Sequence, residues 1–151
     1  MISETARTSL AGCANRRSQG GAPKVLVDTD VVVDLIRKYP PALAWLTGLA
    51  DEEVWLPGFA AMELLQGCRN KAEQRILERE LRAFIVVWPS PEACTAALDV
   101  FARRRLGSGL GMLDALIGVL AADLELPLHT FNRKHYTAIP RLKTRQPYRK
   151  G

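Results

Sequence analysis

The chain has 151 residues, and 48% of them are hydrophobic and 25% charged. This length suits one domain with a sizeable core, and the composition excludes wholesale disorder. It contains no run of 18 uncharged apolar residues, which argues against a membrane span, and its three scattered cysteines lack the spacing of a zinc site or a disulfide framework. Unpaired thiols suit the reducing environment of the cytoplasm.

Charge is distributed unevenly along the chain. The net charge is +5, made up of +3 over residues 1–24, −5 over residues 25–125 and +7 over residues 126–151. The basic C-terminal segment suits a polyanion such as nucleic acid, and it equally suits a solvated tail. Charge alone does not separate these two interpretations.

The order of the predicted elements indicates an α/β domain. Residues 1–23 are polar and aperiodic, which predicts a disordered basic extension ahead of a single domain over residues 24–150. Short apolar runs predict strands over 25–27, 54–56, 84–88 and 128–130. Helices are predicted from a cap at Asp30 through 37, and over 40–50, 59–68, 71–82, 92–105 and 112–125, with a glycine-rich loop over 106–111. Alternating strands and helices predict a mainly parallel sheet, whose ligands gather at the carboxyl ends of the strands.

Three acidic side chains stand in apolar surroundings. Asp28 ends the first predicted strand, Glu63 is the only charged residue over 58–68, and Asp114 is the only one over 106–122. Each acid alone has an ordinary explanation as a helix cap, an ion pair or an edge residue. Together they fall on one rim of a parallel sheet, where two carboxylates 4 Å apart repel by ~4 kcal/mol at an effective dielectric near 20. A cluster of carboxylate oxygens suits Mg²⁺ or Mn²⁺.

Four segments, in this order, resemble the motifs of PIN-domain ribonucleases: Val-Asp-Thr-Asp-Val-Val-Val-Asp over 27–34, Glu-Leu-Leu-Gln-Gly over 63–67, Leu-Asp-Ala-Leu-Ile over 113–117 and His-Thr-Phe-Asn-Arg-Lys-His-Tyr over 129–136. Within that family the chain looks most similar to the VapC toxins of bacterial toxin–antitoxin pairs. The resemblance covers about residues 24–148. It implies a three-layer α/β/α sandwich, usually a homodimer, that cleaves RNA with Mg²⁺ or Mn²⁺ and leaves 5′-phosphate and 3′-hydroxyl ends.

The resemblance also assigns roles to residues. Asp28, Glu63 and Asp114 match the three principal acids of the family and are the predicted catalytic and metal-binding residues. Asn132 stands where many members carry a fourth acid, which leaves open whether the site holds one metal ion or two. Thr130 is expected either to donate its hydroxyl proton to a carboxylate or to be an ordinary strand residue.

RNA and a protein partner need contacts outside the acidic rim. Because that rim repels a polyanion, basic side chains must hold the RNA backbone, and Arg133, Lys134, Arg103 and Arg104 are the candidates. The resemblance implies a cognate VapB-like antitoxin that lays a helix in an apolar groove. The early helices offer apolar residues for that groove or for ordinary core packing: Leu35, Ile36, Leu43, Trp45, Leu46 and Leu49.

Two other functional classes are compatible with the sequence. The run Asp-Thr-Asp-Val-Val over 28–32 also resembles the opening motif of haloacid-dehalogenase-type phosphatases, in which Asp28 would be the nucleophile. That class also needs a downstream lysine and a later paired-acid motif, and Asp123 and Glu125, the only acids after Asp114, do not form such a motif. The second alternative is a catalytically silent RNA- or protein-binding module of the same fold. In the nuclease interpretation, Asp30 is a helix cap, Asp34 is solvated, and the two histidines are structural or face RNA.

Overall fold

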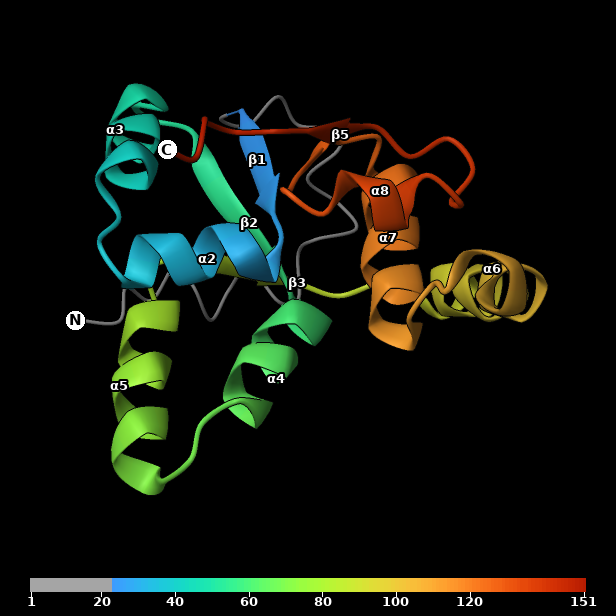
Figure 1. Cartoon of the computed structure of the whole chain (residues 1–151), viewed down its shortest axis with the longest axis horizontal. Coiled ribbons are helices and arrows are strands. Elements are labelled where there is room, and N and C mark those ends of the chain that lie inside the picture. The colour runs from blue at the N-terminus through green and yellow to red at the C-terminus, as the bar shows by residue number, and fades with distance from the viewer. Residues whose placement is uncertain (1–22) are drawn as a thin grey trace.

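Five parallel strands form the sheet of the computed structural model, which describes residues 23–151 (Figure 1). They are β1 (Lys24–Val27), β2 (Glu53–Pro57), β3 (Ile85–Val87), β4 (Leu128–His129) and β5 (Thr144–Arg145). The order across the sheet is β3-β2-β1-β4-β5, and each neighbouring pair runs parallel. This architecture confirms the predicted α/β class. The extension predicted over residues 1–23 lies almost entirely outside the described residues.

Helices flank this sheet and supply every connection between its first four strands. They are α2 (Thr29–Ile36), α3 (Pro40–Gly48), α4 (Gly58–Gln66), α5 (Lys71–Leu81), α6 (Pro91–Ser108), α7 (Met112–Leu124) and α8 (Arg133–Tyr136). Helix α6 packs along α7, and α4 lies against α2, α5 and α7. Over residues 23–151, no helix combines the length and the apolar character needed to cross a bilayer.

The core lies between the central strands and α7. Its largest fully buried aliphatic side chains are Leu26, Leu56, Ile117, Leu120 and Leu128. Burying a side chain of this size contributes about 1.5–3 kcal/mol, so these residues stabilise the buried cluster that α7 shares with β1, β2 and β4. This packing holds the start of α7 beside the carboxyl end of β1.

The loop predicted over 106–111 is shorter in the structure. Helix α6 continues through Ser108 and ends at Gly109, whose φ of 70° is left-handed. Glycine adopts that conformation without a steric penalty, and for this reason the helix stops there and not at the first glycine of the run. The elements α8 and β5 were not predicted, because four and two residues carry no detectable period.

Gly58, the first residue of α4, provides a stability test of this packing. A Cβ atom placed on Gly58 would stand 2.3–2.4 Å from three atoms of the Trp88 indole. We expect Gly58→Ala to lower the free energy of unfolding by about 1 kcal/mol or more, because the indole must move.

Gly48→Ala is the matched control, since Gly48 ends α3 and an added Cβ would meet no atom within 4 Å. Its free energy of unfolding should stay level or rise, as alanine is the better helix former. Urea denaturation measures both variants. An undiminished free energy of unfolding in Gly58→Ala would contradict the packing described.

Candidate active site

A cavity of about 290 Å³ opens where β1 meets α2. It is lined by the acidic residues Asp28, Asp30, Glu63 and Asp114, together with Thr29, Phe131, Asn132 and Lys150. These residues come from the β1–α2 junction, α4, α7, the segment after β4 and the C-terminal segment. The fold therefore brings the three acids singled out in the sequence, and Asn132, to one place.

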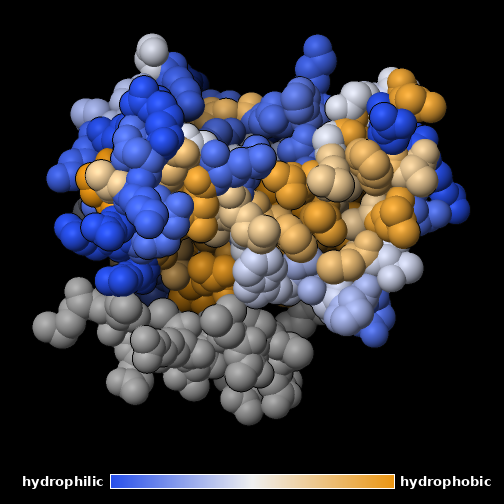
Figure 2. Space-filling view, turned by 90° about the horizontal axis from the view of Figure 1, so that it is seen from below, coloured by the Kyte–Doolittle hydropathy of each residue, from blue (hydrophilic) through white to orange (hydrophobic). Residues whose placement is uncertain are grey.

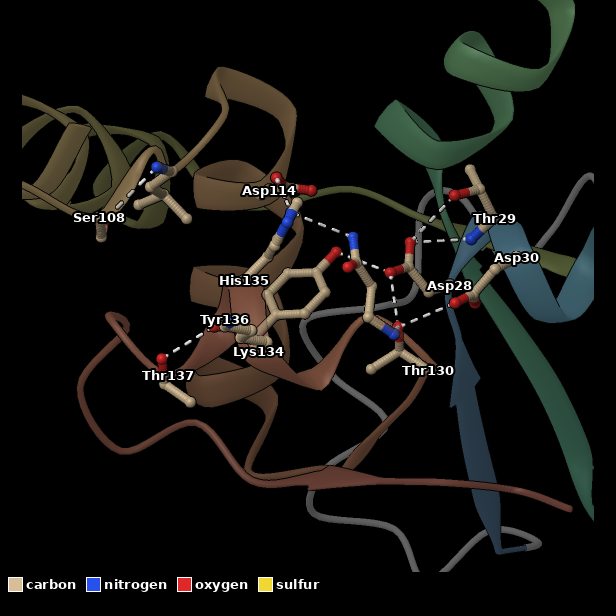
Figure 3. A network of polar contacts seen from close by, with 12 residues as sticks. Asp28, Thr29, Asp30, Ser108, Asp114, Thr130, Lys134, His135, Tyr136 and Thr137 are labelled. Atoms are coloured by element: carbon tan, nitrogen blue, oxygen red, sulfur yellow. Dashed lines mark hydrogen bonds and ion pairs between the residues drawn. The ribbon is translucent and has the colours of Figure 1, made fainter. Parts of the chain in front are cut away.

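Asp28 is the most buried of these acids, with 4% of its surface exposed. It follows β1 directly and caps α2, because its Oδ1 accepts a hydrogen bond from the Thr29 backbone N–H at 2.8 Å. Its Oδ2 accepts hydrogen bonds from the hydroxyls of Tyr136 at 2.7 Å and Thr130 at 3.1 Å (Figure 3). Burial raises the pKa of the Asp28 carboxyl, and the hydrogen bond from Tyr136 partly opposes that shift.

Thr130 is fully buried and lies between two carboxylates. Its Oγ1 is 3.1 Å from Asp28 Oδ2 and 3.2 Å from Asp30 Oδ2. A hydroxyl has one proton, so Thr130 donates to only one of them at a time. When it donates to Asp30, a lone pair of Asp28 is left for another ligand.

Asp30 does not have the role predicted for it. Because Asp28 caps α2, Asp30 falls inside the first turn of that helix. Its Oδ2 accepts a hydrogen bond from the Phe131 backbone N–H at 2.8 Å. Asp30 thus ties α2 to the segment that follows β4, a long-range contact that a local capping rule does not detect.

Tyr136 was not identified as a site residue from the sequence. It is 2% exposed on α8, and its hydroxyl donates the short hydrogen bond to Asp28. Burial and the negative charge of Asp28 raise the pKa of the Tyr136 phenol, so it stays protonated as a donor. Gly118 of α7 makes room for Ile139 and for this ring, since a Cβ there would lie 2.2 Å from Ile139 Cδ1 and 3.2 Å from Tyr136 Cδ1.

Glu63 and Asp114 complete the acidic wall. The pKa of the Glu63 carboxyl is raised by partial desolvation and then by the negative charges of Asp28 and Asp114. Asp114 lies in the first turn of α7 with 26% of its side chain exposed, and its Oδ2 is 3.8 Å from His135 Nδ1. The negative charge of Glu63 is therefore close enough to those of Asp28 and Asp114 for electrostatic repulsion.

The donor set suits a hard divalent cation. Mg²⁺ and Mn²⁺ prefer carboxylate oxygens, and the mutual repulsion of these acids is relieved by a positive charge between them. Within residues 23–151, no three carboxylate, thiol or imidazole groups are arranged closely enough to hold an ion as they lie. Binding would therefore draw the acids inward, and the exposed Glu63 is the one most free to move.

Asn132 lines the cavity with a neutral side chain. Its backbone N–H donates to Thr130 Oγ1 at 3.0 Å, and its side-chain Nδ2 lies 3.2 Å from His135 Nδ1. The amide offers a neutral oxygen or nitrogen to the cavity and leaves the negative charge to the acids.

The basic residues predicted to contact RNA are exposed but do not line the cavity. Arg133 and Lys134 lie on α8, directly after Asn132, whereas Arg103 and Arg104 lie on the last turns of α6. The basic side chain that does line the cavity is Lys150.

Asp34 is not the solvated residue that the sequence predicted. Its side chain is 14% exposed, and its Oδ2 accepts a hydrogen bond from the Tyr148 hydroxyl at 2.7 Å and pairs with Lys150 Nζ at 3.1 Å. The position of Asp34 on its helix predicted a solvent-exposed side chain, but the C-terminal segment packs over it. Its partners lie more than a hundred residues away in the sequence, so no local pattern reports them.

The two histidines occupy different environments. His129 Nδ1 lies 3.2 Å from the carbonyl oxygen of Leu26, and its ring packs 5.5 Å from that of Trp45. Burial lowers the pKa of His129, which keeps it neutral and makes it a structural residue. His135 is exposed beside Asp114 at the edge of the site.

The raised pKa values of Asp28 and Glu63 lead to a testable pH dependence. A carboxyl whose pKa is higher in the folded state binds more protons there, so the free energy of unfolding falls as pH rises from about pH 4. Without added metal, Glu63→Gln should therefore raise Tm at neutral pH, with a difference from wild type that shrinks on acidification.

With Mg²⁺ added, the wild type should have the higher Tm and Glu63→Gln the lower one, because Mg²⁺ binding to the folded state stabilises the wild type more. Thermal unfolding with EDTA and with Mg²⁺ across this pH range is the measurement. A Tm difference independent of both pH and Mg²⁺ would contradict the electrostatic coupling of these acids.

Comparison with known proteins agrees with this architecture. The family model of the PIN domain matches residues 25–140, and the chain belongs to the PIN-domain family. Among curated relatives it is 31% identical to Ribonuclease VapC10 of Mycobacterium tuberculosis over 121 residues, covering 79% of this chain and 90% of that protein. The resemblance predicted from the four sequence motifs is confirmed.

Solved structures show the same fold. The structure of VapBC2 from Rickettsia felis, bound to a DNA fragment from its promoter, contains a chain that is 25% identical with a TM-score of 0.65, covering 81% of this chain and 97% of that one. A chain of VapBC-1 from nontypeable Haemophilus influenzae is 21% identical with a TM-score of 0.66, covering 82% and 98%.

Proposed function

We propose that this chain is a divalent-metal-dependent endoribonuclease of the VapC type, the toxin of a toxin–antitoxin pair. The observation that carries this proposal is the meeting of Asp28, Glu63 and Asp114 at one cavity of a PIN fold. The relative that is 31% identical over 90% of its length is a ribonuclease by name, which supports RNA as the substrate.

The roles of the residues follow from their surroundings. Asp28, Glu63 and Asp114 would hold Mg²⁺ or Mn²⁺, with Thr130 and Asn132 as accessory residues. Such an ion, when bound, neutralises phosphate oxygens and lowers the pKa of a coordinated water. The carboxylates of Asp28, Glu63 and Asp114 and the amide of Asn132 suit one tightly held ion, with room for a second held loosely.

The acids also differ in what they can do to a proton. Asp28 is buried and held by Tyr136 and Thr130, so its position is fixed. Glu63 is exposed to the cavity, and its raised pKa brings it closer to the value at which a carboxylate works as a base near neutral pH. We assign to Glu63 the role of orienting the attacking water and accepting its proton. Asp28 and Asp114 would hold the metal ion.

Apolar surface supports protein partners, which we propose to be a VapB-like antitoxin and a second copy of this chain. Figure 2 shows apolar side chains gathered beside the polar helix α5, on the face that includes α4, α6 and α7. Large apolar side chains are exposed on these helices: Met62, Leu98, Leu106 and Met112. Exposed apolar patches of this kind mark interaction sites.

The early-helix groove predicted for the antitoxin is only partly exposed. Leu35 is buried in the core, whereas Leu43 and Leu46 of α3 remain exposed and available to a partner. The structures of related VapBC proteins support an antitoxin of this class. We propose that the protein acts in the cytoplasm, which suits an RNA substrate and such a partner.

The direct test is cleavage of total RNA by the purified protein. We expect cleavage with Mg²⁺ or Mn²⁺, none with EDTA, and products with 5′-phosphate and 3′-hydroxyl ends. Hydrolysis of p-nitrophenyl phosphate without RNA cleavage would favour the phosphatase alternative, and RNA binding without cleavage would favour the silent module. Co-purification of a small protein encoded beside the gene, with loss of activity in the complex, tests the antitoxin.

A further inference from the structure

Lys150 is the one basic side chain among the residues that line the acidic cavity in the described part of the chain. Its ammonium pairs with Asp34 Oδ2 at 3.1 Å and lies 4.3 Å from the centre of the Phe131 ring. Its side chain is 45% exposed, so it faces the cavity and solvent together. A positively charged group thus lies at the edge of a cavity whose other charged side chains are all acidic.

The segment that carries Lys150 is tied down on both sides of it. The Tyr148 hydroxyl donates to Asp34 Oδ2 at 2.7 Å, and the Gly151 backbone N–H donates to the Tyr39 hydroxyl at 3.1 Å. The Tyr148 ring packs against three other aromatic rings, with centroid separations of 4.9–6.1 Å: Phe131, Tyr39 and Trp45. We call residues 148–151 the strap. Its contacts fix where the Lys150 ammonium lies.

We propose that Lys150 is a substrate-positioning residue that contacts an RNA phosphate next to the scissile bond. This inference rests on the proposed ribonuclease function. An ammonium group has three N–H donors, and the pair with Asp34 occupies one of them. Because the acids repel the RNA backbone, a cation fixed at their edge supplies the attraction that the cavity wall itself lacks.

The way Lys150 is held distinguishes this role from two others. Its ion-pair partner Asp34 lies on α2, outside the trio of Asp28, Glu63 and Asp114, so its position does not depend on those acids. This separates it from a plug that fills the metal site. Tyr148 also donates a hydrogen bond to Asp34 and anchors the segment through its ring contacts, so the fold does not depend on Lys150 alone.

The experiment compares Lys150→Ala and Lys150→Arg with wild type and with Lys143→Ala. Lys143 is an exposed cation in the same basic segment, and it lines a different cavity. For a defined RNA oligonucleotide with Mg²⁺, we expect Lys150→Ala to raise KM about tenfold with little change in kcat. Arginine should restore most of the loss, and Lys143→Ala should behave as wild type.

Binding provides a second readout that does not require cleavage. In an Asp114→Asn background, fluorescence anisotropy of the same RNA should show about tenfold weaker binding after Lys150→Ala. The slope of log affinity against log salt concentration should also fall in magnitude by about one. Tyr148→Phe should weaken binding in the same direction, because it loosens the strap. Mg²⁺ affinity measured by calorimetry should not change in Lys150→Ala.

The outcomes separate the role of Lys150 from the ribonuclease function. If wild type cleaves RNA and Lys150→Ala matches it in KM, RNA affinity and salt dependence, the role of Lys150 is overturned and the ribonuclease proposal stands. If wild type fails to cleave RNA with any divalent ion, the proposed function fails, and the anisotropy measurement still decides whether Lys150 binds RNA. A changed Mg²⁺ affinity with unchanged RNA affinity would also overturn the role of Lys150.

Discussion

Asp114→Asn is expected to lower metal-dependent RNA cleavage roughly 10²–10³-fold while leaving the fold intact. The variant removes one of the three carboxylates assigned to the metal ion, and a metal contact of this kind is worth several kcal/mol of barrier. Asp114 is 26% exposed, and its Oδ2 lies 3.8 Å from His135 Nδ1. Asparagine has the same shape, so little packing is lost.

The control for this prediction lies on the same helix. Asp123 is exposed in the last turn of α7, and Asp123→Asn should cleave RNA at the wild-type rate. Initial rates with Mg²⁺, together with Tm and circular dichroism, separate loss of activity from loss of fold. Near-wild-type cleavage by a folded Asp114→Asn protein would remove this acid from the mechanism.

Tyr136→Phe is the second variant with a large expected effect, although Tyr136 is assigned no contact with RNA. It removes the hydroxyl that donates to Asp28 Oδ2 at 2.7 Å, where both residues are buried. Loss of a residue that orients a metal ligand typically costs 10–100-fold in metal affinity or activity, and we expect cleavage to fall by about this factor. Stability should fall by about 1.5–3 kcal/mol, as for other hydrogen bonds to a charged group.

The signature of this role is a change in pH dependence. Since the hydrogen bond from Tyr136 holds down the pKa of Asp28, its loss should raise that pKa further. The acidic limb of the rate profile should then move to higher pH, and half-saturation should require more Mg²⁺.

Thr137→Val is the control. It removes a hydroxyl at the end of the same short helix, and this hydroxyl donates to the Lys134 carbonyl oxygen and not to Asp28. Its rate profile and Mg²⁺ requirement should match those of the wild type. If Tyr136→Phe also keeps the wild-type acidic limb and Mg²⁺ requirement, Tyr136 is only a packing residue.

The parts of the fold that could be predicted are those with a local signal. Apolar runs marked β1 to β4, and the position of Asp28 at the end of β1 followed from the first of these runs. Glu63 and Asp114 stood out because each is an isolated charge on an otherwise apolar helix. Helix α8 and strand β5 have four and two residues and no apolar run, so tertiary contacts alone define them.

The parts that could not be predicted depend on contacts between distant residues. Tyr136 meets Asp28 across 108 positions, and Tyr148 meets Asp34 across 114. Periodicity and capping rules describe neighbours within a few positions, and they assigned Asp30 and Asp34 to local roles that the structure does not show. The aromatic surroundings of Lys150 are hidden from the sequence for the same reason.

The measurement that tests this account most directly is anomalous diffraction from crystals of the wild-type protein grown with Mn²⁺. We predict one strong peak in the cavity, at about 2.0–2.2 Å from carboxylate oxygens of Asp28 and Asp114, with Glu63 bound directly or through water. A cavity without a peak, in crystals of protein that cleaves RNA only with Mn²⁺ or Mg²⁺, would contradict the assignment of these acids to the metal.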